Sequence, residues 1–134
     1  MGEVRFAGYA AIFGLPDRGG DVIRAGAFAG AGPVPLLWQH RGPPVGSIDA
    51  VAEDARGLRV VGWIADPGLA AMVADGALTG LSVGYRVRQA RAGRWRELHA
   101  VELVEVSLVA NPMQRLARVH AVEGEENAGG VAAG

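Results

Sequence analysis

The stretch Thr79-Gly80-Leu81-Ser82-Val83-Gly84-Tyr85-Arg86-Val87 alternates along its length and predicts a β-strand. Its apolar and aromatic side chains share one face, whereas Gly80, Ser82 and Gly84 share the other. A glycine within a strand weakens it and often marks the close approach of another group. The two glycines leave the Ser82 hydroxyl on open backbone, which suits a nucleophile that meets a peptide carbonyl. The alternative is that Ser82 simply fills a tight position in a β-barrel.

Length and composition predict one domain with a hydrophobic core, because half of the 134 residues are hydrophobic. The net charge is −1 and the basic residues are dispersed, so a nucleic-acid partner is not expected. The chain has no cysteine, which excludes disulfides and thiolate chemistry. No apolar run reaches the ~18 residues of a membrane span, and the first residues do not resemble a secretory signal. We therefore expect a soluble cytoplasmic protein with no membrane partner.

Short apolar runs separated by glycine and proline predict strands through most of the chain. The expected strands cover residues 4–13, 36–40, 45–52, 57–64, 79–87 and 98–109, and residues 116–122 form a final strand or helix. The run Arg41-Gly42-Pro43-Pro44 is expected to end the strand at His40, because proline cannot donate to a ladder. The strands 45–52 and 57–64 are expected to form a hairpin.

One helix is predicted clearly. Asp66 is a good N-cap, Pro67 suits the first helical position, and Gly76 lies where the helix would end. Together with the strands, this predicts a mainly β (α+β) fold, a small closed or nearly closed β-barrel with one or two flanking helices. The predicted domain covers residues 1–122, and residues 123–134 are expected to form a flexible, acidic, Gly/Ala-rich tail.

A serine hydroxyl needs a base to become a good nucleophile at neutral pH. The chain has three histidines, His40, His99 and His120. We favour His40, because it closes an apolar run that would hold its backbone rigidly. The alternative for each histidine is an ordinary surface or hydrogen-bonded side chain.

Two acids lie in the apolar run 102–109, where an unpaired carboxylate would be costly to bury. Glu105 shares its face with Ser107, whereas Glu102 lies on the opposite face and nearer the start of the strand. A carboxylate can orient a catalytic histidine and stabilise its charged form. Glu105 is therefore the preferred partner of the histidine and Glu102 the fallback, unless both point outward into solvent.

Other kinds of site are disfavoured by spacing. The three histidines lack a short metal-ligand spacing, so we expect neither a metal nor a cofactor. The run Gly80-Leu81-Ser82-Val83-Gly84 matches the letters of a nucleophile elbow, but the strand continues after it and no strand-to-helix turn follows. No glycine-rich segment is followed by the Gly-Lys-Ser/Thr of a phosphate loop.

Taken in order, several segments resemble the tailed-phage prohead maturation proteases, which occur in phages, prophages and gene transfer agents. The resemblance extends to about residue 117. It is carried by Gly8-Tyr9-Ala10-Ala11-Ile12-Phe13, Asp21-Val22-Ile23, Gly26-Ala27-Phe28, Pro35-Leu36-Leu37-Trp38-Gln39-His40, Val45-Gly46, Gly57-Leu58, Gly80-Leu81-Ser82-Val83-Gly84-Tyr85, and Leu103-Val104-Glu105-Val106-Ser107-Leu108-Val109-Ala110-Asn111-Pro112.

The resemblance implies a herpesvirus-protease-like β-barrel and a serine endopeptidase. It implies Ser82 as nucleophile, His40 as general base and Glu105 as third member of the triad. The implied substrates are the scaffold, the N-terminal segment of the major capsid protein and the protease itself, inside an immature capsid in the bacterial cytoplasm. The herpesvirus analogy alone places oxyanion donors around Asn111–Arg115 and suggests a homodimer. The acidic tail replaces the longer C-terminal region of many members, which leaves scaffold attachment and self-cleavage open.

Two hypotheses are alternatives to a protease function. One is a non-catalytic β-barrel that acts as a scaffold or interaction module of the procapsid. The other is a scaffold–protease remnant that binds capsid protein without activity. The first predicts that Ser82, His40 and Glu105 lie far apart, or that Ser82 points into a packed core. A Ser82 hydroxyl within hydrogen-bonding reach of a His40 nitrogen would argue against both.

Overall fold

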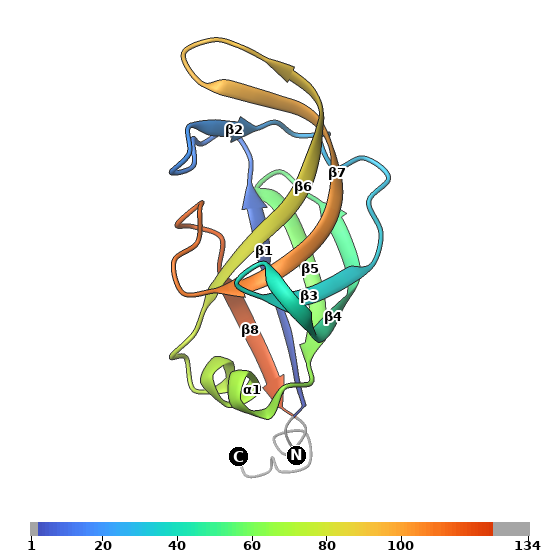
Figure 1. The fold of residues 1–134 in the computed structure, drawn as a ribbon, viewed down its shortest axis with the longest axis vertical. Coiled ribbons are helices and arrows are strands. Elements are labelled where there is room, and N and C mark those ends of the chain that lie inside the picture. The colour runs from blue at the N-terminus through green and yellow to red at the C-terminus, as the bar shows by residue number, and fades with distance from the viewer. Residues whose placement is uncertain (1–2, 125–134) are drawn as a thin grey trace.

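The computed structural model describes residues 3–124, which form one strongly curved sheet and a single short helix (Figure 1). Within these residues no helix has the length and apolar character needed to cross a membrane. The elements in chain order are β1 (Val4–Ile12), β2 (Asp21–Ile23), β3 (Val34–Trp38), β4 (Arg41–Glu53), β5 (Gly57–Ile64), α1 (Pro67–Ala74), β6 (Gly80–Arg91), β7 (Arg96–Val109) and β8 (Val119–Gly124).

The strands follow the order β2-β7-β3-β4-β5-β1-β8, and β6 pairs with β7 beside this path. The predicted mainly β fold is confirmed, whereas the closed or nearly closed barrel is not. Among the residues described, no continuous ladder joins β6 to β8; an isolated bridge links Gly80 of β6 to Arg118, the residue before β8. One or two helices were expected, and the described residues contain one, α1.

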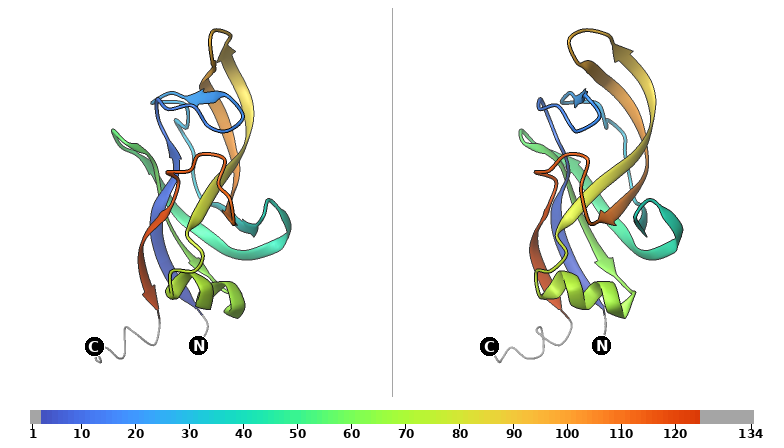
Figure 2. Two further views of the ribbon diagram at one scale, coloured as in Figure 1. Left: turned by 90° about the vertical axis from the view of Figure 1, so that its left-hand side faces the viewer. Right: turned by 60° about the vertical axis from the view of Figure 1, so that its left-hand side comes forward.

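The core lies inside the curve of the sheet, which Figure 2 shows from two sides. Buried and less buried residues alternate along most of β5, whereas β1 and the end of β7 contain runs of consecutive buried residues. The largest fully buried apolar side chains are Leu36, Ile48, Leu58, Ile64, Leu81, Leu98 and Leu108. The β6–β7 hairpin extends beyond the other strands at the end away from α1 (Figures 1 and 2).

Helix α1 forms as its end signals predict. The Asp66 carboxylate accepts a hydrogen bond of 2.9 Å from the Leu69 N–H, which satisfies one of the free donors of the first turn. Ala70 and Val73 are buried, so α1 covers one end of the core. Gly76 follows the helix at a φ of 83°, a conformation that glycine adopts without a steric cost.

The prediction that proline ends the strand at His40 is wrong. β3 ends at Trp38, and β4 begins at Arg41 and runs through both prolines. The β3–β4 register pairs Trp38 with Arg41 and then Leu36 with Gly46. Pro43 and Pro44 lie between these paired positions and are exposed, so neither has to donate to the ladder.

The last strand also extends past the predicted domain end. β8 pairs with β1 from Val119 to Gly124, so Glu123 and Gly124 belong to the sheet and not to the predicted tail. The remaining tail, residues 125–134, lies outside the described residues. The hairpin predicted from strands 45–52 and 57–64 is confirmed as the β4–β5 pair.

Candidate active site

Ser82 lies near the start of β6, where the strand borders a cleft. Its Cα pairs across the ladder with Ser107 of β7, and the next pair on the same face joins Gly84 to Glu105. The Ser82 residue is 7% exposed, and it lines the cleft together with Gly84. Ser82 therefore borders the cleft and is not enclosed in the core.

His40 lies in a two-residue turn between β3 and β4, closed by the pair Trp38–Arg41. Gln39 and His40 both have positive φ, 56° and 63°, the combination that a type I′ hairpin turn requires. Such turns favour asparagine and glycine, so these two residues are strained. Their backbone donors are bound by β7: the Gln39 N–H donates to the Leu108 carbonyl at 2.9 Å, and the His40 N–H donates to Ser107 Oγ at 2.9 Å.

The His40 side chain is paired with Glu105. Nδ1 of the imidazole lies 2.6 Å from Glu105 Oε2. An ionised carboxylate can only accept, so Nδ1 carries the proton in the neutral ring and Nε2 keeps a free lone pair. The second carboxylate oxygen, Oε1, accepts from the Ser107 hydroxyl at 2.8 Å. The Glu105 side chain is 10% exposed against 41% for that of His40, so the carboxylate is the buried member of the pair.

The electrostatic effect of this contact falls on His40. The hydrogen bond to Glu105 and the negative charge of that carboxylate raise the pKa of His40 above its usual value, although partial burial acts in the opposite direction. The arrangement therefore stabilises the charged imidazolium. A base that must take a proton from a serine gains from such a partner.

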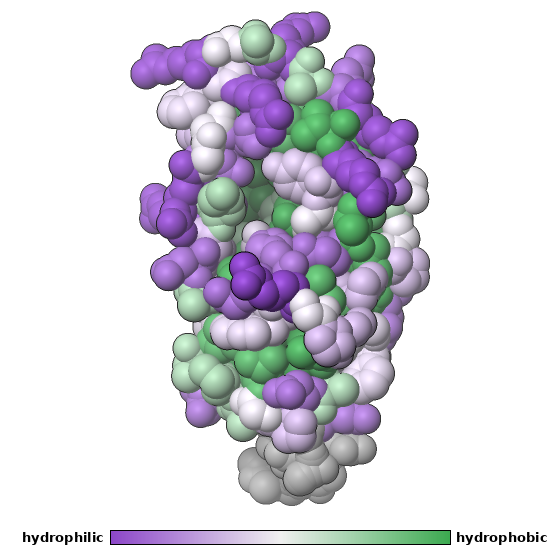
Figure 3. Space-filling view, in the orientation of Figure 1, coloured by the Kyte–Doolittle hydropathy of each residue, from purple (hydrophilic) through white to green (hydrophobic). Residues whose placement is uncertain are grey.

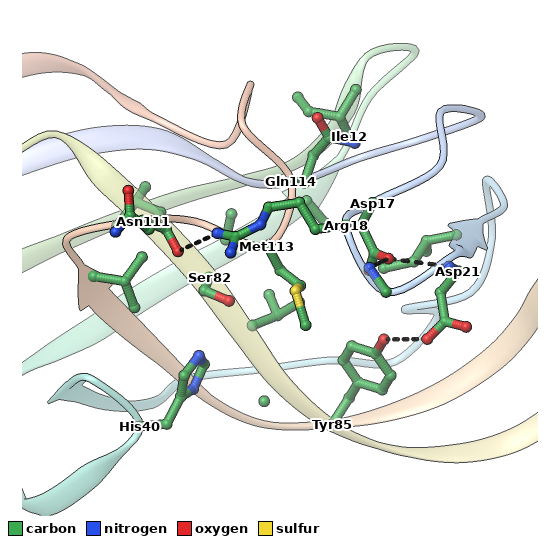
Figure 4. A pocket seen from close by; sticks show the side chains of 18 of the residues that line it. Ile12, Asp17, Arg18, Asp21, His40, Ser82, Tyr85, Asn111, Met113 and Gln114 are labelled. Carbon is green, nitrogen blue, oxygen red and sulfur yellow. Dashed lines mark hydrogen bonds between the residues drawn. The ribbon is translucent and has the colours of Figure 1, made fainter.

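The cleft beside Ser82 has a volume of about 540 Å³. It is bordered by β6, by the end of β1 and by two loops, residues 13–20 and 110–118. The loops are tied together, since the Arg18 N–H donates to the Met113 carbonyl at 2.9 Å and the Arg18 guanidinium donates to the Asn111 carbonyl at 3.4 Å. Figure 3 shows a hollow with apolar residues in its floor and polar side chains at its edge. In Figure 4 the His40 ring is directed toward the Ser82 side chain.

A polar cluster forms the far end of the cleft. Asp21 accepts two hydrogen bonds from the Arg96 guanidinium, at 2.8 and 2.9 Å, and one of 3.4 Å from the Tyr85 hydroxyl. The hydrogen bond from Arg96 holds the pKa of Asp21 below its usual value. Burial and the nearby carboxylates of Asp21 and Asp17 raise the pKa of Tyr85 to about 12. The phenol is therefore a hydrogen-bond donor at neutral pH.

The structure brings His40 and Glu105 into contact and places Ser82 in the same cleft. In the part of the chain that the structure describes, no hydrogen bond joins Ser82 to His40; catalytic contacts are often loose without a substrate. The fallback Glu102 lies elsewhere, where its carboxylate accepts from Arg88 at 2.6 Å on the protein surface.

The other two histidines lie away from the cleft. His99 Nε2 is 3.3 Å from Glu97 Oε1, and His120 packs against the ring of Tyr9 at a centroid distance of 5.7 Å. Within residues 3–124 no three His, Cys, Asp or Glu side chains are grouped as metal ligands. Sequence reasoning assigned no role to Ser107, although the alternation of β7 had placed it on the face of Glu105.

These features agree with a family match. A family model described as Caudovirus prohead serine protease matches residues 1–129. The chain belongs to this family. A prohead protease of Enterobacteria phage HK97 is 33% identical over 141 aligned positions, which cover 90% of this chain and 62% of that relative. This prohead protease family member thus spans less than two thirds of the length of its relative.

Solved herpesvirus proteases share the fold. The KSHV protease, in complex with a hexapeptide phosphonate inhibitor, matches with a TM-score of 0.62 and 16% identity over 92% of this family member and 66% of the viral chain. The varicella-zoster virus protease matches with a TM-score of 0.57 and 16% identity over 94% and 66% of the two chains. The expected herpesvirus-protease-like fold is confirmed.

Proposed function

We propose that this chain is a serine endopeptidase of head maturation, in which Ser82 is the nucleophile, His40 the general base and Glu105 the partner of His40. The single observation that carries this proposal is the His40–Glu105 contact, which leaves His40 Nε2 free in the cleft that Ser82 lines. Membership of the prohead serine protease family supports the reaction class.

In the proposed reaction His40 Nε2 accepts the proton of the Ser82 hydroxyl while Ser82 Oγ bonds to the carbonyl carbon of a peptide. The C–N bond then breaks, and the imidazolium gives its proton to the departing amine. Water, activated by the same nitrogen, hydrolyses the acyl-serine and restores the hydroxyl. Glu105 accepts a hydrogen bond from the His40 Nδ1–H throughout and stabilises the imidazolium by its negative charge.

The tetrahedral intermediate needs donors for its oxyanion, typically worth about 3 kcal/mol each. The loop Asn111–Arg115 is our candidate source. Asn111, Met113 and Gln114 of this loop line the same cleft as Ser82, which supports the proposal. The ties from Arg18 would hold the loop in place beside the reacting carbonyl.

The substrates proposed are proteins of the immature capsid: the scaffold segment, the major capsid protein and the chain itself, cut inside the procapsid. A cleft of this size, open along β6, can take an extended peptide that reads side chains alternately. The bound hexapeptide phosphonate of the KSHV protease supports a peptide as the ligand class. A homodimer stays a prediction by analogy with the herpesvirus enzymes.

The test is co-expression with a phage major capsid protein, followed by intact mass of both proteins. We expect wild type to shorten the capsid protein and Ser82→Ala to leave it at full length. Ser47→Ala is the matched control, because Ser47 lies on β4 outside the cleft, where its hydroxyl binds Asp49. It should process as wild type does.

Processing by Ser82→Ala would overturn the assignment of the nucleophile. Full-length capsid protein in all three strains, with assembled capsids present, would instead favour the non-catalytic scaffold. A shortened protease only where Ser82 is intact would show that the chain also cuts itself.

A further inference from the structure

We propose that Ser107 is a positioning residue, which holds His40 and Glu105 together and aligns both with Ser82. The inference rests on the proposed function, because its purpose is to keep the proposed base oriented. Nothing in the reaction requires Ser107 to touch the substrate. It acts through the two residues that it binds.

The hydroxyl of Ser107 bridges the base and its partner. It accepts a hydrogen bond of 2.9 Å from the His40 backbone N–H and donates one of 2.8 Å to Glu105 Oε1. The third side of this ring is the 2.6 Å contact between His40 Nδ1 and Glu105 Oε2. One buried hydroxyl thus fixes the main chain of the histidine and turns the carboxylate toward its ring.

The chemistry of this position favours serine. A hydroxyl is both a donor and an acceptor, and the ring of hydrogen bonds uses both capacities. Ser107 is 0% exposed, so water cannot easily replace it. Alanine would leave the His40 N–H without its acceptor and Glu105 Oε1 without its donor, and such losses are costly in a buried site.

The strained turn explains why His40 needs this support. His40 has a φ of 63°, a conformation that costs about 1–2 kcal/mol for a residue with a side chain. Its N–H is bound by the Ser107 side chain and not by a ladder carbonyl. Without that hydrogen bond, His40 is less strongly stabilised in the left-handed region. A change in its backbone conformation would also move the imidazole ring.

The sheet register places Ser107 between β6, which carries Ser82, and β3, which leads to the turn of His40. Its Cα pairs with Ser82 on β6 and with Leu37 on β3, two residues before the turn that holds His40. Directly opposed residues of antiparallel strands have Cβ atoms only about 5 Å apart. Ser107 is therefore the point where the nucleophile strand and the strand leading to the base meet.

The first arm of the test measures how fast a fluorophosphonate probe labels Ser82, as the maximal rate kinact and the half-saturation constant KI. We expect Ser107→Ala to lower kinact about 10- to 100-fold, since hydrogen bonds to charged groups are worth about that much. KI should change less than about twofold, because the cleft wall is intact. The control Val60→Ala removes a fully buried side chain of β5 that does not line the cleft, and it should leave both constants unchanged.

An unchanged kinact in Ser107→Ala, or an equal fall in Val60→Ala at matched thermal stability, would overturn the positioning role. If Ser107→Ala does not fold, Ser107→Cys replaces it. A thiol keeps the volume but is a weak donor and acceptor, so labelling should still be slower than in wild type. Equal labelling of Ser107→Cys and wild type would count against the proposal.

The second arm separates this inference from the proposed function. In the Ser82→Ala background, proton NMR should show a far-downfield, exchange-protected signal from the proton on His40 Nδ1. The signal is assigned to His40 because it should remain in the His99→Gln and His120→Gln variants. Adding Ser107→Ala should broaden this signal or remove it. A signal that persists unchanged overturns the role of Ser107. A wild type that the probe does not label at Ser82 overturns the proposed nucleophile, and the NMR result still decides the role of Ser107.

Discussion

Glu105 can reach His40 because the residue opposite it on β6 has no side chain. Gly84 pairs with Glu105 across the ladder, and a methyl group built on Gly84 would overlap Glu105 Oε2 and lie 2.8 Å from its Cδ. The carboxylate therefore passes over the Gly84 backbone on its way to the imidazole. This close approach is the reason for a glycine within the strand at this position.

We expect Gly84→Ala to displace the Glu105 carboxylate and break its contact with His40. The rate at which the fluorophosphonate labels Ser82 should fall at least about tenfold, the loss expected when a hydrogen bond to a charged group is removed. The measurement is the rate of Ser82 labelling beside that of Gly32→Ala, a control at which an added methyl meets nothing within 4 Å. Equal rates in the two variants would show that Gly84 does not make room for the carboxylate.

At this scale the structure brings two of the three predicted site residues, His40 and Glu105, into contact and places Ser82 in the same cleft. Alternation and chemistry were enough to select Ser82, His40 and Glu105 as candidates. The two glycines were taken to open the backbone around Ser82, whereas Gly84 gives room to Glu105. The bridge through Ser107 depends on a backbone N–H in a left-handed turn, which no spacing rule predicts.

Among the elements, the turn between β3 and β4 determines where the His40 ring can point. Its two residues are in the left-handed region without being glycine, and β7 supplies their partners. The Gln39 side chain adds one more bond, since its Oε1 accepts from the Ala110 N–H at 2.8 Å. Strain that persists at a functional site is held in this way by its surroundings.

This strain predicts an ordering of two variants at Gln39. Both Gln39→Ala and Gln39→Gly lose the bond to Ala110, but glycine adopts a φ of 56° without the steric cost. Gln39→Gly should therefore be more stable than Gln39→Ala by about 1 kcal/mol in urea denaturation. At Ala50, an exposed position of β4, alanine should instead be the more stabilising residue, so Ala50→Gly should be less stable than wild type. The same order at both positions would contradict the strained turn.

Elements whose boundaries depend on nearby residues in the sequence were predicted well. Elements whose boundaries depend on pairing with another strand were not. Asp66, Pro67 and Gly76 are the boundaries of α1 in the sequence and in the structure. Pro43 is a breaker by its own chemistry, yet β4 runs through it because the ladder skips that position. Whether a proline must donate depends on a register that only the folded sheet defines.

For the whole molecule, the site depends on pairings between distant segments. β3 and β2 both join β7 in parallel, and β6 runs antiparallel to the full length of β7. No short-range pattern predicts these partners, so the sequence did not predict the sheet order, and the closed or nearly closed barrel that it did predict was not confirmed. The long strand β7 is the common neighbour, which is why it carries Glu105 and Ser107 and also binds the turn of His40.

The raised pKa of His40 links the stability of the whole fold to pH. Glu105 favours the charged imidazolium in the folded state, so folding stabilises the protonated form. This contribution is fully present below the unfolded-state histidine value of ~6.5 and is lost as pH rises through the higher folded value. The proposed catalysis needs the opposite form, because only a neutral ring could accept the proton of Ser82.

The prediction is that stability from this pair and the labelling rate change in opposite directions with pH. The coupling free energy of His40 and Glu105, from a double-mutant cycle of His40→Gln and Glu105→Gln in urea, should be larger near about pH 6 than near about pH 9. Over the same range the rate of Ser82 labelling by the fluorophosphonate should rise, and Glu105→Gln should move its midpoint to lower pH. A coupling free energy that is constant or grows with pH would mean that Glu105 does not stabilise the charged ring. A midpoint that Glu105→Gln leaves in place would mean that another group controls the reactivity of Ser82.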